Sequence, residues 1–442
     1  MESLQFNNNN LKLYDENNNE IGEIIKLTEN ENKQNLNNNN NIEKNIACEN
    51  KKIAIKDNFI TPPLIGLENL AFTSYLNATL QCLCQIEKIV NYFKYNNKIN
   101  EKLKQYKDNN INETITFAFK NIIENLWPSN SDYINNEYNH QNMNNKYYSP
   151  YIFKEILIKM YNINNKEPKD LINFLITKLH DELNKAPKNI IVNNNNFEID
   201  QSNKMVMLSN FAQKFIKENQ SIISDIFYGI KYNCIECSNC KIIKYYFHSY
   251  LLLVFPLDEI KNYKIKQLQN FMLLNQNFML IDPIIYQQNL LNVQLNIQTI
   301  NSVNIYDCFE FEQNKECFIF NNSQYCNNCN NMYPFLNKNI LYTIPEILII
   351  ALNREISSNI KLEFAEDLNL MNFIEMKDTG FQLKLIGVIT YVGNENYISY
   401  CKSPIDYQWY KYENDSVSKV LNFNEQILNY GVPYILFYQK IK

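Results

Sequence analysis

Cysteines are the residues whose spacing points most directly to chemistry in this chain. Two pairs, Cys237-x-x-Cys240 and Cys326-x-x-Cys329, have the spacing of paired metal ligands. Four thiolates from two such pairs form the closed tetrahedral site of a structural zinc ion. Cys234 offers an overlapping pair with Cys237. The residues therefore predict a structural Zn²⁺ site in which Cys234 and Cys240 are alternatives for one ligand.

The bulk composition excludes several classes of protein. With 11 cysteines in 442 residues and no basic-then-apolar leader, the chain does not read as a secreted disulfide scaffold. No apolar run reaches the roughly 18 residues of a membrane span. The net charge is −5 and Arg354 is the only arginine, so the basic face of a nucleic-acid binder is missing. We expect a cytoplasmic or nuclear protein that contacts neither membrane nor nucleic acid.

Two amphipathic segments in the N-terminal half of the chain are expected to position the residues of a functional site. Apolar residues recur at helical spacing over Tyr75–Phe93, with Ser74 at its start, and again over Asp170–Leu183. The second half of the chain holds short runs of β-branched and aromatic residues, at Tyr250–Pro256, Ile347–Leu352, Leu383–Val388, Tyr397–Tyr400 and Tyr434–Tyr438. Helices first and strands later predict an α+β fold, with a helical lobe packed on a mostly antiparallel sheet.

The polar composition of the N-terminal region sets the domain boundaries. Residues 1–60 are Asn-rich and too polar to offset the entropy of ordering, so we expect a disordered tail. The folded domain is expected to span residues 63–441. Residues from about 261 to 299 fit neither the helix nor the strand pattern and are expected to be an insertion.

The segment from Gly66 to Leu83 reads GLENLAFTSYLNATLQCL. It resembles, in one ungapped register, the N-terminal catalytic box of ubiquitin-specific proteases, Gly-Leu-x-Asn-Leu-Gly-Asn-Thr-Cys-Tyr-Met-Asn-Ser-x-Leu-Gln-x-Leu. Later blocks are similar to the same family in the same order, at Lys169–Asn184, Asp225–Gly229, Ile344–Arg354, Phe381–Val388, Asn396–Tyr400, Trp409–Val417 and Val432–Lys440. The resemblance covers about Leu64–Lys440. It implies a papain-like fold with a helical thumb, an antiparallel β palm and zinc-knuckle fingers that cradle ubiquitin.

The resemblance also chooses between the two candidate sets of zinc ligands. In the family pattern, the spacing to Gly229 and to Pro256 fits Cys237 and Cys240 without gaps. The expected ligands are therefore Cys237, Cys240, Cys326 and Cys329.

The family's catalytic positions hold residues that cannot do its chemistry. The resemblance implies a cysteine nucleophile activated by a histidine, but these positions hold Ser74 and Asn396. A serine hydroxyl without a base is a poor nucleophile, and an amide is no general base near neutral pH. The third position holds Glu413, or Asn414 if one gap is allowed. Asn69, at the position of the oxyanion-stabilising asparagine, is retained.

Substitutes for the lost groups are not apparent in the sequence. Cys82 and Cys84 lie roughly 12–15 Å along the helix from position 74, and we expect them to be buried. The three histidines, His140, His180 and His248, all lie outside the C-terminal box. The glycine-containing walls of the family's channel for the ubiquitin tail are replaced by Ala71-Phe72 and Asn394-Glu395, which implies a narrowed channel.

The sequence therefore predicts an inactive ubiquitin-specific protease homologue, a pseudoprotease. It would bind ubiquitin, a ubiquitin-like protein or a partner in a protein complex. Two alternatives stay open: an active deubiquitinase that works through Ser74 or an unidentified base, and a structural scaffold that has also lost ubiquitin binding.

Overall fold

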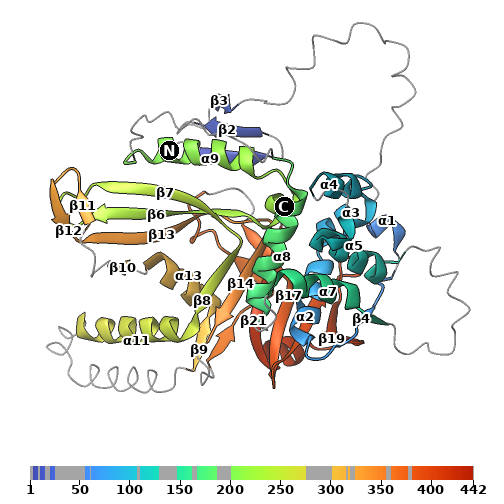
Figure 1. Cartoon of the computed structure of the whole chain (residues 1–442). Helices are drawn as coiled ribbons and strands as arrows, with labels where there is room; N and C mark the ends of the chain where they lie inside the picture. Colours follow the sequence, from blue (N-terminus) through green and yellow to red (C-terminus); the bar gives the residue numbers. More distant parts are fainter. Residues whose placement is uncertain are drawn as a thin grey trace, which may run out of the picture.

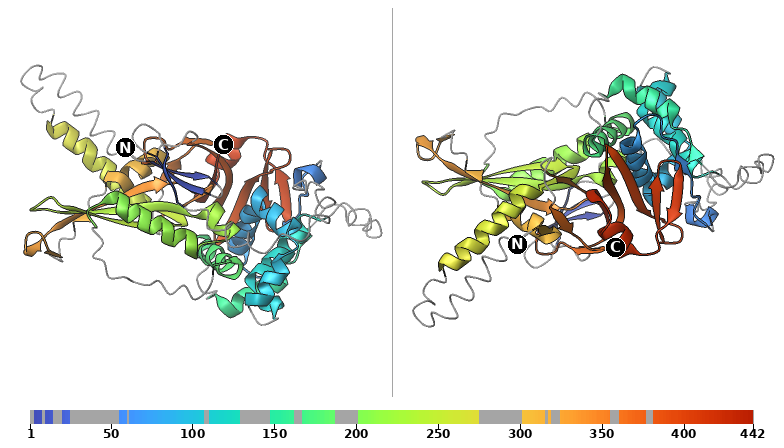
Figure 2. Two further views of the ribbon diagram at one scale, coloured as in Figure 1. Left: turned by 90° about the horizontal axis from the view of Figure 1, so that it is seen from above. Right: turned by 90° about the horizontal axis from the view of Figure 1, so that it is seen from below.

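A computed structural model describes most of the chain from Ile55 onward. The described residues are 3–7, 10–14, 20–24, 55–59, 61–106, 110–128, 147–161, 167–186, 201–274, 301–314, 317–318, 324–354, 360–376 and 381–441. These residues form three parts: a helical lobe, a large central sheet, and a narrower sheet that projects away from the helices (Figures 1 and 2). Among the described helices, none combines the length and the apolar character needed to cross a bilayer.

The helical lobe packs around α2, whose residues are all buried. Its members are α1 (Ile55–Asn58), α2 (Ser74–Cys84), α3 (Glu87–Tyr95), α4 (Ile99–Tyr106), α5 (Ile115–Leu126), α7 (Tyr151–Met160), α8 (Pro168–Leu183) and α10 (Ile222–Phe227), with a 3₁₀ turn at Ile111–Glu113. Two short parallel strands, β4 (Gly66–Leu67) and β5 (Tyr147–Tyr148), join the segment before α2 to the segment before α7.

One expected helix, Tyr75–Phe93, is two helices in the structure. The chain breaks at Gln85 and Ile86, and Ile86 adopts an extended backbone conformation. The indole N–H of Trp127 donates to the carbonyl of Cys84 at 2.9 Å. That bond occupies a carbonyl that a continuous helix would use four residues later. The second expected helix is confirmed as α8, which begins two residues early at Pro168.

The central sheet corresponds to the expected palm, and its strand order is β20-β19-β18-β17-β21-β14-β8, with β16 paired to β17. The strands are β8 (Leu252–Pro256), β14 (Ile347–Asn353), β16 (Asp367–Asn369), β17 (Gln382–Gly393), β18 (Asn396–Lys402), β19 (Trp409–Glu413), β20 (Ser416–Lys419) and β21 (Val432–Lys440). All pairs are antiparallel except β14 with β8. The predicted strands are thus present, most of them longer than predicted.

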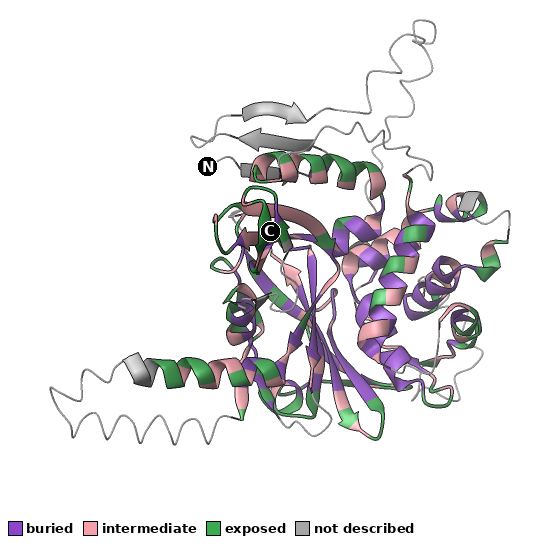
Figure 3. Ribbon diagram, turned by 60° about the vertical axis from the view of Figure 1, so that its left-hand side comes forward, coloured by how far each residue is buried: buried purple, intermediate pink, exposed green. Residues whose placement is uncertain are grey.

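The sheet is buried on both faces, as the purple strands of Figure 3 show. In β14, Ile347 and Ile349 face the helical lobe, whereas Leu348 and Ile350 face a second core. An apolar run without polar alternation is typical of a strand covered on both sides. The second core also contains residues of α11 (Leu257–Leu274), α13 (Ile305–Asn314), β9 (Ser302–Asn304), β15 (Lys361–Glu363) and the turn of π-helix at Asn424–Leu428.

The projecting sheet corresponds to the expected fingers. Its strand order is β10-β13-β6-β7, from β6 (Gly229–Cys237), β7 (Ile243–Tyr250), β10 (Cys317–Phe318) and β13 (Phe335–Thr343). A hairpin of β11 (Gln324–Cys326) and β12 (Asn331–Tyr333) lies near its tip. Helix α9 (Lys204–Glu218) covers one face of this sheet through Leu208 and Ala212.

The domain boundaries differ in part from the sequence expectation. Packing into the helical core begins at Ile55, which is fully buried, rather than at residue 63. Within the expected tail, β1 (Ser3–Asn7), β2 (Asn10–Tyr14) and β3 (Glu20–Ile24) form a three-stranded antiparallel sheet. The expectation of disorder for residues 25–54 lies outside the described residues. Helix α11 extends into the expected insertion as far as Leu274, and residues 275–300 also lie outside them.

Candidate active site and metal centre

Ser74 begins helix α2 and is closed off from solvent. Its side chain is 1% exposed. The hydroxyl donates to the backbone carbonyl of Glu395 at 3.3 Å and accepts from the backbone N–H of Tyr397 at 3.2 Å. Both partners belong to the segment that contains Asn396. The hydroxyl proton therefore points at a carbonyl oxygen that cannot remove it, and among the described residues no side chain is hydrogen-bonded to Ser74 as a base.

The turn before Asn396 brings these backbone groups to Ser74. Gly393 pairs with Asn396, so Asn394 and Glu395 form a two-residue hairpin turn between β17 and β18. Both have positive φ, 51° and 58°, as a type I′ turn requires. Tyr397 faces the helical core, whereas Asn396 is exposed. The residue at the family's histidine position is thus exposed, whereas the hydroxyl of Ser74 is buried.

The loop before α2 carries strain at the two positions where the family has Gly-Asn. Ala71 and Phe72 have φ of 57° and 59°. Non-glycine residues in this left-handed region cost about 1–2 kcal/mol each. The Phe72 side chain is 70% exposed. Strained backbone of this kind is concentrated at functional sites, and here it directly precedes Thr73 and Ser74.

Asn69 keeps a defined orientation beside Ser74. Its Oδ1 accepts from the backbone N–H and from the hydroxyl of Thr73, at 3.0 and 3.2 Å. A backbone N–H needs an acceptor, so these bonds fix which amide atom is oxygen. The Nδ2 donor is therefore directed away from Thr73, and Asn69 is an exposed residue. The assignment of Asn69 to the oxyanion position stays a prediction.

Glu413 ends strand β19, and Asn414 lies in the turn between β19 and β20. Ser399 pairs with Tyr412, and continuing this register places Glu413 opposite Ile398, on the same face as Asn396. Glu413 is exposed and forms an ion pair with Lys411 at 2.7 Å. Asn414 instead turns toward α2, where its Oδ1 accepts from the Nδ2 of Asn77 at 2.9 Å. The alternation favours Glu413 at the third catalytic position, and the assignment stays a prediction.

The substitute nucleophiles and bases considered from the sequence make their described contacts with residues other than Ser74. Cys82 and Cys84 are buried, as expected, and Cys82 lies 3.7 Å from Cys401. Burial raises the thiol pKa of Cys82 and Cys84 well above the ordinary value, so both stay neutral thiols. His180 Nδ1 lies 2.7 Å from the Ser221 hydroxyl, and His248 belongs to β7. His140 lies outside the described residues.

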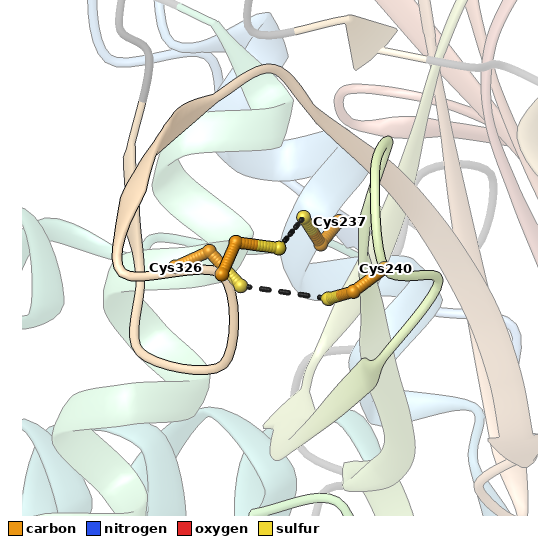
Figure 4. Close-up of side chains that lie close together, drawn as sticks. Cys237, Cys240 and Cys326 are labelled. Carbon is orange, nitrogen blue, oxygen red and sulfur yellow. Dashed lines mark hydrogen bonds between the residues drawn. The ribbon is translucent and has the colours of Figure 1, made fainter.

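The four expected metal ligands converge near the tip of the fingers. The sulfur atoms of Cys237, Cys240, Cys326 and Cys329 all lie within 4.8 Å of one another, and Figure 4 shows three of them labelled. Cys237 to Cys329 measures 3.9 Å and Cys240 to Cys326 measures 3.6 Å. Tetrahedral zinc with bonds of about 2.3 Å would separate its sulfur ligands by about 3.8 Å. The geometry therefore fits a zinc knuckle.

Local backbone also prepares this cluster for a cation. A hydrogen bond from the backbone N–H of Ile242 lowers the pKa of the Cys240 thiol and so favours the thiolate that metals bind. Cys234, the alternative ligand, is outside the cluster. It packs in the core between α9 and the fingers, and burial raises its pKa. The choice of Cys240 over Cys234 agrees with this geometry.

A cavity of about 740 Å³ lies between the helical lobe and the fingers. One wall is the exposed side of α8, and the opposite wall is formed by β6, β7 and β8. Its lining includes the charged residues and histidines Lys169, Asp170, His180, Asp181, Lys231 and His248. A hollow with both charge signs and an apolar strip along β8 suits a folded protein surface better than a small ligand.

The comparisons with known proteins agree with this architecture. A family model described as "Ubiquitin carboxyl-terminal hydrolase" matches residues 65–438, most of the chain. The chain belongs to this family. The resemblance of Gly66–Leu83 and of the later blocks to ubiquitin-specific proteases is thereby confirmed.

Relatives within the ubiquitin carboxyl-terminal hydrolase family are distant. Ubiquitin carboxyl-terminal hydrolase 2 of Bos taurus is 20% identical over 394 residues, 85% of this chain and 55% of its own length. Ubiquitin carboxyl-terminal hydrolase 15 of Xenopus tropicalis is 25% identical over 200 residues, 44% of this chain and 19% of its own length. The chain thus spans between about a fifth and about half of these curated relatives.

Solved structures of family members share the fold. The yeast SAGA deubiquitinating module matches with a TM-score of 0.55 at 17% identity, over 87% of this chain and 70% of that chain. The SAGA module with Ubp8 bound to monoubiquitin matches with a TM-score of 0.55 at 15% identity, over 86% and 70%. The α+β thumb, palm and fingers fold is therefore confirmed.

Some features of this site cannot be predicted from local sequence patterns. The contacts of Ser74 with Glu395 and Tyr397 join positions more than 300 residues apart. The exposed residues of α8 that line the cavity carry ordinary surface side chains. A two-residue turn between two alternating strands is, in contrast, a recognised hairpin signal, and it could have placed Asn394 and Glu395 at the tip of β17–β18.

Proposed function

We propose that this chain is a member of the ubiquitin carboxyl-terminal hydrolase family that binds ubiquitin or a ubiquitin-like protein and does not cleave it. One observation carries the proposal. The hydroxyl of Ser74 is bonded on both sides by backbone groups next to Asn396, and no described side chain acts on it as a base. Acyl transfer needs an activated nucleophile and a proton acceptor, and this centre supplies neither.

Binding is supported by what the fold retains. The cavity between α8 and the fingers is concave and lined by charges of both signs. Curated relatives are named ubiquitin carboxyl-terminal hydrolases, and the related Ubp8 module has been solved with bound monoubiquitin and with partner subunits. We extend both properties to this chain: ubiquitin or a ubiquitin-like protein in the cavity, and assembly into a protein complex.

The two alternatives lead to different outcomes. An active deubiquitinase is favoured only by Asn69, whose amide donor is still directed outward. One such donor contributes about 3–4 kcal/mol to transition-state stabilisation, which does not replace a nucleophile and a base. A scaffold that has also lost ubiquitin binding would keep the fold and the four-cysteine centre and leave the cavity without a partner.

Zinc is the metal that we propose for the four-cysteine cluster. Four thiolates in tetrahedral positions are the ligand set of structural zinc sites. Bound there, the ion would join the β6–β7 turn to the hairpin of β11 and β12 and hold the tip of the fingers together. It would have no part in hydrolysis.

Two measurements test the proposal. A ubiquitin probe with a C-terminal electrophile is expected to give no covalent adduct, and an adduct at Ser74 would establish the active alternative. Calorimetric titration with ubiquitin and with ubiquitin-like proteins is expected to show binding. The cavity-wall variant Lys231→Glu should weaken it at least tenfold, whereas the exposed Lys419→Glu on β20 should not. If none of these proteins binds, the proposal fails and the alternative of a structural scaffold without ubiquitin binding is favoured.

A further inference from the structure

Two side-chain bridges connect the start of α8 to the palm. The Tyr434 hydroxyl donates to Oε2 of Glu167 at 3.0 Å, and the ammonium of Lys169 donates to Oδ1 of Asn353 at 3.3 Å. Lys169 and Glu167 also form an ion pair at 3.5 Å. These four residues, called here the thumb–palm latch, link the helical lobe to the ends of β14 and β21.

The latch is in contact with the cavity through one residue and is linked to Ser74 through another. Lys169 lines the cavity directly. The Tyr434 ring packs edge-on against Tyr397, with 5.5 Å between ring centroids. Tyr397 in turn donates its backbone N–H to Ser74. Contacts therefore run without interruption from Lys169 in the cavity wall, through Glu167, Tyr434 and Tyr397, to the buried hydroxyl of Ser74.

The palm side of the latch is held in place by its neighbours. Arg354 follows Asn353 and donates through Nη1 to the carbonyl of Pro433 at 2.6 Å, which ties the end of β14 to the start of β21. Burial and then the Glu167 carboxylate raise the pKa of Tyr434. Its hydroxyl stays protonated over the physiological range and remains a donor to Glu167.

A tail entering from the cavity would have to break both bridges. It would separate the charged pair of Lys169 and Glu167 from its partners on the palm, and it would still meet the side chains packed around Tyr397. The folded surface of a partner faces no such obstacle, because the cavity walls of α8 and the fingers lie on the outer side of the latch.

We propose that the thumb–palm latch closes the passage from the cavity to Ser74, so that the chain recognises its partner by a folded surface and independently of an extended C-terminal tail. This inference rests on the proposed function for the identity of the partner. The closure itself is a property of the chain alone and can be measured without any partner.

The first experiment measures closure with a chemical reporter. In the full chain carrying Ser74→Cys, the rate at which iodoacetamide alkylates the introduced thiol is followed by mass spectrometry of the peptide that contains position 74. Adding Tyr434→Phe and Lys169→Ala should raise this rate at least tenfold. The matched control is Tyr438→Phe, which removes a hydroxyl bond to Ala365 from the same strand on its other face, and should change the rate less than twofold.

An equal rate with and without the latch substitutions would overturn the inference. If the combined variant fails to fold, as judged by thermal unfolding, Tyr434→Phe alone tests the same point, because it removes a single oxygen. The result is independent of ubiquitin binding, so failure of the proposed function and failure of the latch are distinguishable.

The second experiment uses ubiquitin and ubiquitin lacking its last two residues. The unmodified protein should bind both with dissociation constants within about twofold. The variant with Tyr434→Phe and Lys169→Ala should prefer the complete protein at least fivefold. A large loss on truncation in the unmodified protein would show that the tail already enters and would overturn the inference. If neither form binds, the proposed function fails and alkylation alone decides the latch.

Discussion

The hydroxyl of Ser74 donates to the backbone carbonyl of Glu395 across 321 positions of sequence, and it accepts from the N–H of Tyr397 on the other side of Asn396. The residue that stands at the family's nucleophile position is therefore a structural link between α2 and the β17–β18 turn. This link makes Ser74 a residue whose loss should affect stability and leave catalysis unchanged.

Ser74→Ala is expected to destabilise the fold by about 1–3 kcal/mol, because it removes the acceptor of the buried N–H of Tyr397 and the bond to the carbonyl of Glu395. Urea denaturation measures the effect. Ser418→Ala, on exposed strand β20, is the matched control and should change the free energy of unfolding by less than about 0.5 kcal/mol. Equal effects for the two variants would contradict the structural role of Ser74.

Restoring the family's reactive groups tests the chemistry and the latch together. Ser74→Cys with Asn396→His supplies a thiol and a base. By itself this pair is expected to leave a ubiquitin fusion uncleaved, because the tail cannot reach position 74. Adding Tyr434→Phe and Lys169→Ala should give measurable cleavage. Release of ubiquitin by the first pair alone, followed by gel electrophoresis, would contradict the closed passage.

Metal content tests the four-cysteine centre. Purified protein is expected to contain about one zinc per chain by elemental mass spectrometry. Cys326→Ser should abolish this zinc and lower the unfolding temperature, since structural zinc contributes on the order of 10 kcal/mol to folding. Cys234→Ser is the control and should keep its zinc. Zinc-free protein that takes up no added zinc would rule out the site.

The buried carboxylate of Glu182 is expected to be the strongest single cap in the helical lobe. Its oxygens accept from the backbone N–H groups of Ile115 and Thr116, at 3.3 and 2.7 Å, where α5 begins. Glu182→Ala leaves both donors buried and unpaired, at a cost of about 2–4 kcal/mol. Glu124→Ala on the exposed side of α5 loses only an ion pair with Lys120, worth about 0.3–0.5 kcal/mol. Urea denaturation of the two variants measures and compares their free energies of unfolding.

Acid should destabilise the fold in part through His180. Burial lowers the pKa of His180 below its ordinary value of 6.5. Below that value the unfolded chain binds a proton that the folded chain resists, so stability falls as the pH drops from about 6.5. His180→Gln should flatten the fall in unfolding temperature between about pH 6.5 and 5. Part of the fall should remain in this variant, because the pKa of His248 is also lowered. An unchanged profile would exclude His180 as a contributor.

Local pattern was enough to predict the elements that surround the site. The apolar spacing of Asp170–Leu183 places α8 within two residues, because an amphipathic helix against a core is defined by its own periodicity. The run Ile347–Leu352 likewise places β14. The two CxxC pairs, with the family spacing, select the four sulfurs that the fold brings together.

The state of the site depends on contacts that no local pattern encodes. The break between α2 and α3 depends on Trp127, which is distant in sequence. Glu167 and Tyr434 are separated by 267 positions, and neither has a composition or spacing that marks it. The sequence shows that Ser74 and Asn396 lack the family's chemistry. The contact between Glu167 and Tyr434, from which we propose a closed passage to Ser74, is visible only in the fold.

All 11 residues of helix α2 are buried. A helix of this kind offers evolution almost no neutral positions, since each substitution opens a void or forces an overlap in the core. Once selection for catalysis is relaxed, surface loops are free to drift, while α2 is held by its neighbours on every side. The sequence of α2 should therefore stay similar to that of the family for longer than catalytic activity is kept.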